Sequence, residues 1–275
     1  MTMNWDTRVS VIMPAFNASA TIRGSIRSAL VQEHHNLEVL VADDGSTDAT
    51  RDVVLSMAAA DSRVRLLRTS GRNGPAGARN VAIAAARGRW LAFLDSDDVW
   101  HPAKLAQQLA VARETAASLV YAGYWRVSED GRLAGRPVAV PPSLGYRQLL
   151  GDSAIATSTV LLDRGILGTP SMDRGVGYDD FELWTRLLAH GAVAAGVDGP
   201  LMAYRVREGS VSRRRVRMSR EVWKVIRQRR GMPLPQACAC FASYAVRAAL
   251  KHRNHRPSRP AAAVLPGEML ALLAD

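Results

Sequence analysis

Cysteine and long apolar runs are both scarce in this chain of 275 residues. The two cysteines, Cys238 and Cys240, stand two positions apart and provide neither a disulfide framework nor the ligand set of a zinc site. No apolar stretch reaches the length of about 18 residues that a membrane span needs, and the first ten residues lack the apolar run of a signal peptide. We therefore expect a cytoplasmic protein, either soluble or attached peripherally to a membrane surface.

Acidic residues are scarce in the last quarter of the chain, where the basic residues gather. The formal net charge is +11, from 36 Lys and Arg against 25 Asp and Glu. Residues 204–259 hold 16 of these basic side chains and only two acidic ones, so this segment carries +14 and the remainder carries −3. Because 48% of the residues are hydrophobic and 22% charged, the chain can close a core, which excludes disorder of the whole protein.

The first hundred residues alternate short β-branched runs with amphipathic helical segments. Apolar runs predict strands at residues 9–13, 38–42, 64–67 and 90–94, with helices between them. This alternation predicts an α/β fold with a mostly parallel, Rossmann-like central sheet flanked by helices.

Beyond residue 118 the pattern is less regular. We expect strands at 119–127 and 155–162, a turn at 128–132 and a helix at 179–190 that Gly191 ends. From Arg213 onward the chain is basic and is expected to be helical in pieces.

Polar clusters stand at the carboxyl ends of three of the predicted strands. They are PAFN at 14–17, DDGSTD at 43–48 and DSDD at 95–98. In open parallel sheets, ligands bind beyond the carboxyl ends of the strands, so these clusters should converge on one crevice.

The carboxylates of the DSDD cluster repel one another unless a cation lies among them, and oxygen-only ligands suit Mg²⁺ or Mn²⁺. Such a site calls for a phosphate-bearing ligand. Acids that cap the helix near Pro102 are the alternative explanation.

Side chains in the other clusters suit nucleotide binding, although each has a structural alternative. Asp44 could accept hydrogen bonds from a base or a ribose, but the DDGS stretch is also an ordinary turn. Phe16 could stack on a base or belong to the core. Arg79 and Asn80, which open a helix after a glycine-rich loop, could reach a base or a diphosphate, or could face solvent.

Taken together, the ordered motifs resemble those of the family-2 glycosyltransferases. The stretch VSVIMPAFN at 9–17 is similar to the opening pattern of that family, and DDGSTD at 43–48, NGPAGARN at 73–80 and the DxD run at 95–97 follow in the family's order. DDFELWTRL at 179–187 is similar to the family's catalytic helix. The resemblance covers about residues 8–212.

The resemblance implies an inverting enzyme of GT-A fold that uses a nucleotide sugar. It implies a catalytic domain at 1–212, followed by a basic, mainly helical extension at 213–275. The donor would be a nucleoside diphosphate sugar, with UDP favoured, and the acceptor a hydroxyl-bearing glycan, lipid-linked molecule or small molecule. The biological context expected for such an enzyme is cell-wall or polysaccharide biosynthesis.

The resemblance also assigns a place to individual residues. Pro14, Phe16 and Asn17 would lie by the nucleotide, Asp44 would accept the uracil N–H, and Arg79 would lie nearby.

For the metal and the base, the resemblance implies four acidic residues. Asp97 would be the ligand of a divalent metal, Mn²⁺ or Mg²⁺, and Asp95 would bind ribose or support the metal site. Asp180 would be the general base, with Asp179 in place of the more usual Glu. Capping of the helix by Asp179 and Asp180 is the alternative that the helix alone would favour.

One departure from the family concerns Arg207. The family often has Tyr-Arg-x-His-x-x-Ser after the catalytic helix, whereas this chain has Arg207 at the position of the histidine. Arginine is not a metal ligand, but its fork of donors could hold diphosphate oxygens. We expect Arg207 to assist the leaving diphosphate.

The basic extension admits several anionic partners. Its arginines could hold a diphosphate, an anionic acceptor or an anionic membrane surface, or could form a solvated helical face. Nucleic acid is the weakest candidate, because no helix-turn-helix, RRM or zinc-finger pattern accompanies the charge. Two alternatives to catalysis stay open: a module that binds nucleotide sugars without transferring them, and a basic nucleic-acid-binding protein.

Overall fold

The structure, a computed structural model, describes residues 7–152, 154–206, 211–228 and 232–275. The first half of the chain forms β1 (Val9–Ala15), α1 (Ile22–Leu30), β2 (Leu37–Asp43), α2 (Thr50–Ala60), β3 (Val64–Arg68), α3 (Gly74–Ala85), β4 (Trp90–Phe93), β5 (Val99–Trp100), α4 (Lys104–Thr115) and β6 (Leu119–Ser128). The second half forms β7 (Leu133–Ala134), α5 (Tyr146–Leu150), η1 (Thr157–Thr159), β8 (Leu161–Asp163), α6 (Arg164–Leu167), α7 (Asp179–Ala189), β9 (Ala194–Val206), α8 (Val211–Gln228), α9 (Leu234–Asn254), β10 (Arg259–Pro260), η2 (Ala261–Ala263) and α10 (Gly267–Ala274).

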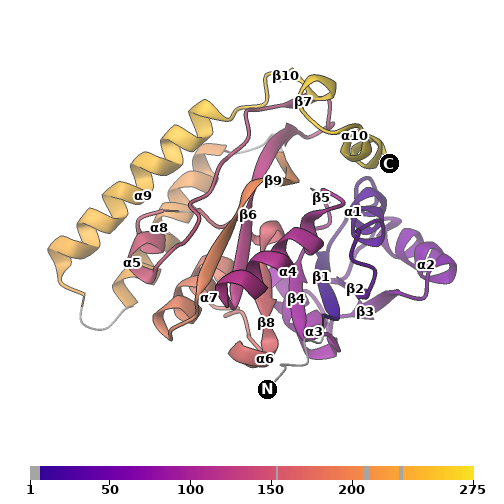
Figure 1. The fold of residues 1–275 in the computed structure, drawn as a ribbon, viewed down its shortest axis with the longest axis horizontal. Helices are drawn as coiled ribbons and strands as arrows, with labels where there is room; N and C mark the ends of the chain where they lie inside the picture. Colours follow the sequence, from indigo (N-terminus) through magenta and orange to yellow (C-terminus); the bar gives the residue numbers. More distant parts are fainter. Residues whose placement is uncertain (1–6, 153, 207–210, 229–231) are drawn as a thin grey trace.

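Within the described residues, all strands join one mixed sheet (Figure 1). The strands β3, β2, β1 and β4 lie side by side and parallel, and β6 pairs with β9 in parallel. Strand β8 is antiparallel to both β4 and β6, and it joins the two parallel groups. The predicted α/β fold with a mostly parallel central sheet is confirmed.

The four strands expected in the first hundred residues are confirmed; β1, β2 and β4 are buried along their whole length, and the edge strand β3 is buried only at Val64. Strand β1 shows why a fully buried strand has no polar face. Val9, Val11 and Met13 pack into the apolar cluster under α1, α2 and α4, while Ile12 packs into the cluster under α3 and α7. Helices cover both faces of the sheet, so both sets of alternating side chains are buried (Figure 1).

The strand expected at 155–162 is only partly correct. Its final residues belong to β8, but Thr157–Thr159 is a turn of 3-10 helix. Side chains, rather than a neighbouring strand, bind this turn: the Trp100 indole N–H donates to the Ser158 carbonyl at 2.6 Å, and the Gln108 amide donates to the Thr159 carbonyl at 2.7 Å.

The helix expected at 179–190 is present as α7, and Gly191 follows it with a φ of +91°. The basic extension is helical as expected. Helices α8 and α9 pack against the cluster under α3 and α7 through Val222, Ile226 and Tyr244. The boundary at residue 212 stays a prediction, and the helices after it share a core with the residues before it.

Helix α10 returns to α1 at the other side of the molecule (Figure 1). A Cβ atom on Gly24 would lie 2.1 Å from the Leu272 carbonyl oxygen, so only glycine allows this approach of the two helices. The C-terminal helix is therefore packed onto the first βα unit.

Candidate active site

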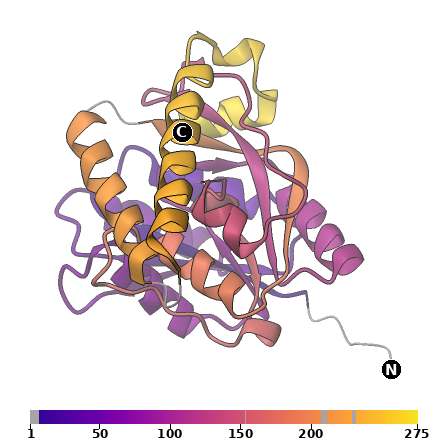
Figure 2. The same ribbon diagram turned by 90° about the vertical axis from the view of Figure 1, so that its left-hand side faces the viewer.

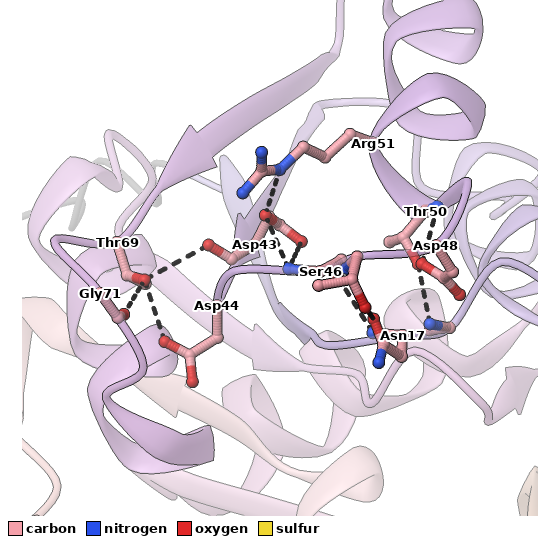
Figure 3. A network of polar contacts seen from close by, with 11 residues as sticks. Asn17, Asp43, Asp44, Ser46, Asp48, Thr50, Arg51, Thr69 and Gly71 are labelled. Atoms are coloured by element: carbon pink, nitrogen blue, oxygen red, sulfur yellow. Dashed lines mark hydrogen bonds and ion pairs between the residues drawn. The ribbon is translucent and has the colours of Figure 1, made fainter.

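The loops after β1 and β2 are tied together beyond the carboxyl ends of these strands (Figure 3). Asn17 adopts a φ of +47°, and its backbone N–H donates to Ser46 Oγ at 3.0 Å. The Thr47 N–H donates to Asn17 Oδ1 at 2.9 Å. Asparagine tolerates the left-handed conformation better than most residues, so it can hold both contacts. The PAFN and DDGSTD clusters thus meet as expected.

The first two acids of the DDGSTD cluster, Asp43 and Asp44, have different partners. Asp43 is buried beneath the loop and accepts hydrogen bonds from the Ser46 N–H and from Arg51 Nε, the latter at 2.6 Å (Figure 3). Burial alone would raise the pKa of Asp43, but the hydrogen bonds from Ser46 and Arg51 outweigh it and hold the pKa below its usual value. Asp43 therefore stabilises the turn as an ion.

Asp44 joins the β2 end to the start of α3. Its Oδ1 accepts from Thr69 Oγ1 at 2.9 Å and from the Asn73 N–H at 2.8 Å, and its Oδ2 accepts from the Gly74 N–H at 2.8 Å. A carboxylate offers about four acceptor positions, so three protein donors leave room for about one donor from a ligand. The contact with Thr69 is visible in Figure 3.

The remaining residues of the PAFN cluster differ in exposure. Pro14 is buried inside β1, opposite Ala42 of β2. Phe16 is 37% exposed, and the guanidinium carbon of Arg72 lies 4.2 Å from the centre of its ring. Arg72 also packs on Gly45, with its Cγ 3.7 Å from the position of a Cβ there. Sequence analysis missed Arg72, because the contact depends on the loop after β3.

Arg79 connects the DSDD cluster after β4 to the start of α7. It is buried on α3, where its Nη2 donates to Asp95 Oδ1 at 2.6 Å and its Nη1 donates to Asp179 Oδ2 at 3.2 Å. Burial alone would lower its pKa, but the charges of Asp95 and Asp179 outweigh this and raise it. One guanidinium therefore joins the DSDD cluster to the first turn of α7.

The DSDD cluster is anchored through Asp98. Its carboxylate is buried and accepts from Ser158 Oγ at 2.6 Å and from the Arg205 N–H at 3.1 Å. The Asp95 N–H donates to the same Ser158 Oγ at 3.0 Å, and Arg205 Nε donates to the Asp97 carbonyl at 3.1 Å. Asp98 thus positions the loop, while Asp95 and Asp97 lie half-buried at its outer side.

Asp180 is held in one orientation at the start of α7. Its Oδ2 accepts a short hydrogen bond from Thr157 Oγ1, and its Oδ1 accepts from the Phe181 N–H at 2.7 Å. Burial raises the pKa of Asp180, although Thr157 and Arg79 oppose the shift. A buried carboxylate with a raised pKa is a better proton acceptor than an exposed one, which suits a general base.

The pKa of Asp179 is raised as well. Burial raises its pKa to about 6, against the opposing charge of Arg79 and with the help of the charge of Asp180. The ion pair with Arg79 does not reverse this shift, because the effect of burial is larger.

Aromatic rings from four elements surround this end of α7. Tyr178 stacks on Phe181 with centroids 5.2 Å apart, and Tyr244 of α9 lies 6.3 Å from Phe181. The rings of Tyr124 on β6 and Tyr204 on β9 are 6.0 Å apart. Burial raises the pKa of Tyr178, and the charge of Asp180 adds to the shift, so this ring lies near the carboxylate.

The acids of the DSDD cluster fit a divalent cation that is shared with a phosphate ligand. Among the described residues no group of three or more His, Cys, Asp or Glu side chains is arranged to hold a metal ion by itself. Burial raises the pKa of Asp98, and the charges of Asp97 and Asp95 add to this, which is the mutual repulsion that a cation relieves. Mg²⁺ is often held by only one or two carboxylates together with substrate phosphates. Asp97 and Asp95 can supply that number.

The structure brings Arg79, Asp95, Asp179 and Asp180 together. Asp44 is tied to the start of α3, the helix that carries Arg79, and Arg207 lies outside the described residues. Sequence analysis included Asp98 in the DSDD cluster but missed further residues of the site; they are Arg72, Thr157, Ser158 and Arg205. For three of these, Thr157, Ser158 and Arg205, a signal was available. The polar triplet Thr-Ser-Thr interrupts an apolar run, and Arg205 stands in the motif that drew attention to Arg207.

Comparisons with known proteins agree with one another. The family model described as Glycosyl transferase family 2 matches residues 10–164. TuaG of Bacillus subtilis, whose name refers to a glycosyltransferase of teichuronic acid biosynthesis, is 34% identical over 248 residues, which are 90% of this chain and 98% of TuaG.

Two further proteins are similar along most of the chain. UDP-Glc:alpha-D-GlcNAc-diphosphoundecaprenol beta-1,3-glucosyltransferase WfgD of Escherichia coli is 38% identical over 222 residues, 80% of this chain and 86% of its own. The solved mannosyltransferase PcManGT of Pyrobaculum calidifontis, in complex with GDP-Man and Mn²⁺, superposes with a TM-score of 0.66 at 20% identity. The superposition covers 97% of this chain and 84% of PcManGT.

Proposed function

Because this chain belongs to glycosyl transferase family 2, we propose that it transfers a sugar from a UDP-linked donor to an acceptor hydroxyl with inversion at the anomeric carbon. It is a glycosyltransferase with a GT-A fold. The observation that carries the proposal is the pair of contacts made by Arg79, which joins the acids of the expected metal site to the helix that begins with Asp179 and Asp180.

The donor side is supported by residues at the carboxyl ends of β1 and β2. The available acceptor position of Asp44 suits an imide N–H of uracil, and the exposed ring of Phe16 suits a base. The name of the relative WfgD gives UDP-Glc as its donor, which favours UDP here. Pro14 and Asn17 shape this site through the backbone, and Asn17 keeps the two loops together.

Asp97, supported by Asp95, would hold a divalent metal on the donor diphosphate. PcManGT was solved with Mn²⁺, which is consistent with such a site. A cation held by these residues would supply positive charge to stabilise the leaving diphosphate. Arg79 keeps Asp95 in place through its 2.6 Å contact, and Asp98 fixes the DSDD loop through its hydrogen bond from Ser158.

Asp180 is the proposed general base. The acceptor oxygen forms a bond to C1 of the sugar while the bond from C1 to the diphosphate oxygen breaks, and Asp180 takes the proton of the acceptor hydroxyl. Thr157 and the Phe181 N–H fix the carboxylate for this transfer. Asp179 holds Arg79 and keeps the first turn of α7 against the loop of Asp95.

The acceptor would lie against the tyrosines near Asp180. Ring faces of Tyr178, Tyr204 and Tyr124 offer apolar surface with hydroxyl groups at its edge, which suits the mixed character of a sugar. WfgD is named for a sugar diphosphate linked to undecaprenol, and TuaG for teichuronic acid biosynthesis. A lipid-linked acceptor in polysaccharide or cell-wall biosynthesis is therefore the acceptor class that we propose.

The experiment is a panel of nucleotide sugars incubated with Mn²⁺ or Mg²⁺ and scored by donor hydrolysis, since this readout needs no knowledge of the acceptor. We expect UDP sugars to be hydrolysed and Asp97→Ala to abolish the signal. The matched control is Asp52→Ala, which removes an exposed acid on α2. Tight donor binding without hydrolysis or transfer for any sugar or acceptor would contradict the proposal and favour a non-catalytic binding module.

Arg207 stays a prediction. If its guanidinium assists the leaving diphosphate, Arg207→Ala lowers turnover with the preferred donor. Unchanged turnover in that variant would refute this role without affecting the assignment of Asp97 and Asp180.

A further inference from the structure

Helix α9 has one long face that the described residues leave uncovered. Figure 1 shows α9 along an outer edge of the molecule, and Figure 2 shows it in front, with α8 beside it. Every exposed side chain between Leu234 and Val246 is apolar, and Leu250 continues the same side of the helix. We call this the apolar face of α9; its members are Leu234, Cys238, Ala242, Ala245, Val246 and Leu250.

The exposure of this face is pronounced, because its large side chains are among the most exposed apolar ones described. Leu234 is 55% exposed, Val246 59% and Leu250 43%. The opposite face of α9 is packed: Ala237 and Tyr244 are buried, and Phe241 contacts Trp223 of α8 with ring centroids 5.5 Å apart. The helix is therefore held by one side, and the apolar face is available to a partner.

Cations predominate beside the apolar face, although Arg247 of α9 pairs with Asp152 at 3.1 Å. Residues 222–267 contain nine Lys and Arg and no Asp or Glu. Arg253, Arg256 and Arg259 are exposed at the C-terminal end of α9 and just beyond it. Arg253 follows Val246 by seven positions, so it stands on the same side of the helix as the apolar face.

From this combination we infer that the apolar face of α9 docks on the surface of a bilayer rich in anionic lipids. Apolar side chains enter the boundary between headgroups and acyl chains, while the arginines contact the headgroup phosphates. A second copy of the chain fits less well, because two such faces in contact would bring their cations together. The described residues contain no helix long and apolar enough to cross a membrane, so attachment through this helix would be peripheral.

Docking would bring the proposed active site close to the bilayer. The inner face of the same helix carries Tyr244, 6.3 Å from Phe181, which follows Asp180 directly. A membrane-borne acceptor could then reach the base without leaving the lipid surface. This consequence for the acceptor rests on the proposed function, whereas binding to the bilayer does not.

The test is flotation of the full chain with vesicles. One set contains phosphatidylcholine alone and the other phosphatidylcholine mixed with phosphatidylglycerol. We expect the protein to float only with the anionic vesicles and to be released by salt. Val246→Glu combined with Leu250→Glu should weaken binding by more than about tenfold, and Arg253→Gln with Arg256→Gln by about fivefold per charge.

Matched controls change the same kinds of residue elsewhere. Leu55→Glu with Ile166→Glu alters two apolar side chains that are 51% and 62% exposed. Arg23→Gln with Arg132→Gln removes two exposed cations. Both control variants should bind anionic vesicles as the parent does. Circular dichroism and thermal unfolding would verify that each variant is folded.

Three outcomes would overturn the inference. They are no flotation of the parent with anionic vesicles, equal losses in the control variants, and a dimer in light scattering that only the substitutions on the apolar face dissociate. The last would assign the face to a second copy. Donor hydrolysis in solution should be unchanged by Val246→Glu with Leu250→Glu, so failure of membrane docking and failure of the proposed function can be told apart.

Discussion

Substitution of Asp179 by asparagine should stabilise the protein at neutral and alkaline pH. Burial raises the pKa of Asp179 from 3.8 to about 6, so the folded protein binds this proton more tightly than the unfolded chain does. A shift of about two units corresponds to about 3 kcal/mol at about 1.4 kcal/mol per unit, as an upper bound. Only 14% of the side chain is exposed, so solvent screening reduces this little.

The sign of the pH dependence follows from the raised pKa. This carboxyl favours the folded state while it is protonated, and that contribution is lost as the pH rises from about 4 through about 6. Asp179→Asn cannot ionise, so its free energy of unfolding should fall less over this range. At about pH 8 we expect the variant to exceed the parent by about 2–3 kcal/mol.

Urea denaturation at a series of pH values measures this difference. Asp52→Asn, at an exposed position on α2, is the matched control and should follow the parent curve. A variant of Asp179 that is no more stable than the parent at about pH 8, with a parallel pH dependence, would refute the reasoning. In that case Arg79 would stabilise the ionised carboxylate more than burial penalises it.

Three other substitutions have defined consequences. Thr157→Val removes the hydroxyl that donates a hydrogen bond to Asp180, so the pKa of Asp180 should rise further. We expect kcat to fall by about tenfold and the acidic limb of the pH–rate profile to move to higher pH, while the KM for the donor stays unchanged. Arg79→Met leaves Asp95 and Asp179, whose side chains are 29% and 14% exposed, without their shared cation and should lower the free energy of unfolding by up to about 3 kcal/mol in urea titrations. Arg205→Met removes guanidinium hydrogen bonds to three carbonyls, among them one in α10, and faster amide exchange in α10 should reveal this. Unaltered α10 exchange would show that its packing on α1 suffices.

Much of the fold and the ends of the first strands could be predicted from the sequence. The apolar runs before residue 95 are short, β-branched and closed by polar turns, so strands and their carboxyl ends follow from local chemistry. The ends of the parallel strands then place Asp44 and Asp95 at one edge of the sheet, whereas Asp180 could be placed only through the resemblance of residues 179–187 to the family's catalytic helix.

The residues that hold these acids could not be predicted in the same way. Ser158 binds Asp98 across 60 positions, and Thr157 binds Asp180 across 23. No repeating pattern of apolar and polar residues in the sequence marks either contact. Both contacts come from a 3-10 turn, within a segment whose local propensity predicts a strand. The uncovered face of α9 was also hidden, because only packing shows which side of a helix stays exposed.

The central claim is that Asp180 removes the acceptor proton during transfer from a donor bound at the neighbouring acids. Its most direct test compares Asp180→Asn with the parent in two measurements, donor Kd by calorimetry and kcat for transfer. We predict that kcat falls by about a thousandfold while donor Kd stays within about twofold, because the variant keeps its shape and loses only the base. Transfer at the parent's rate would contradict the claim, as would a loss of donor binding as large as the loss of transfer.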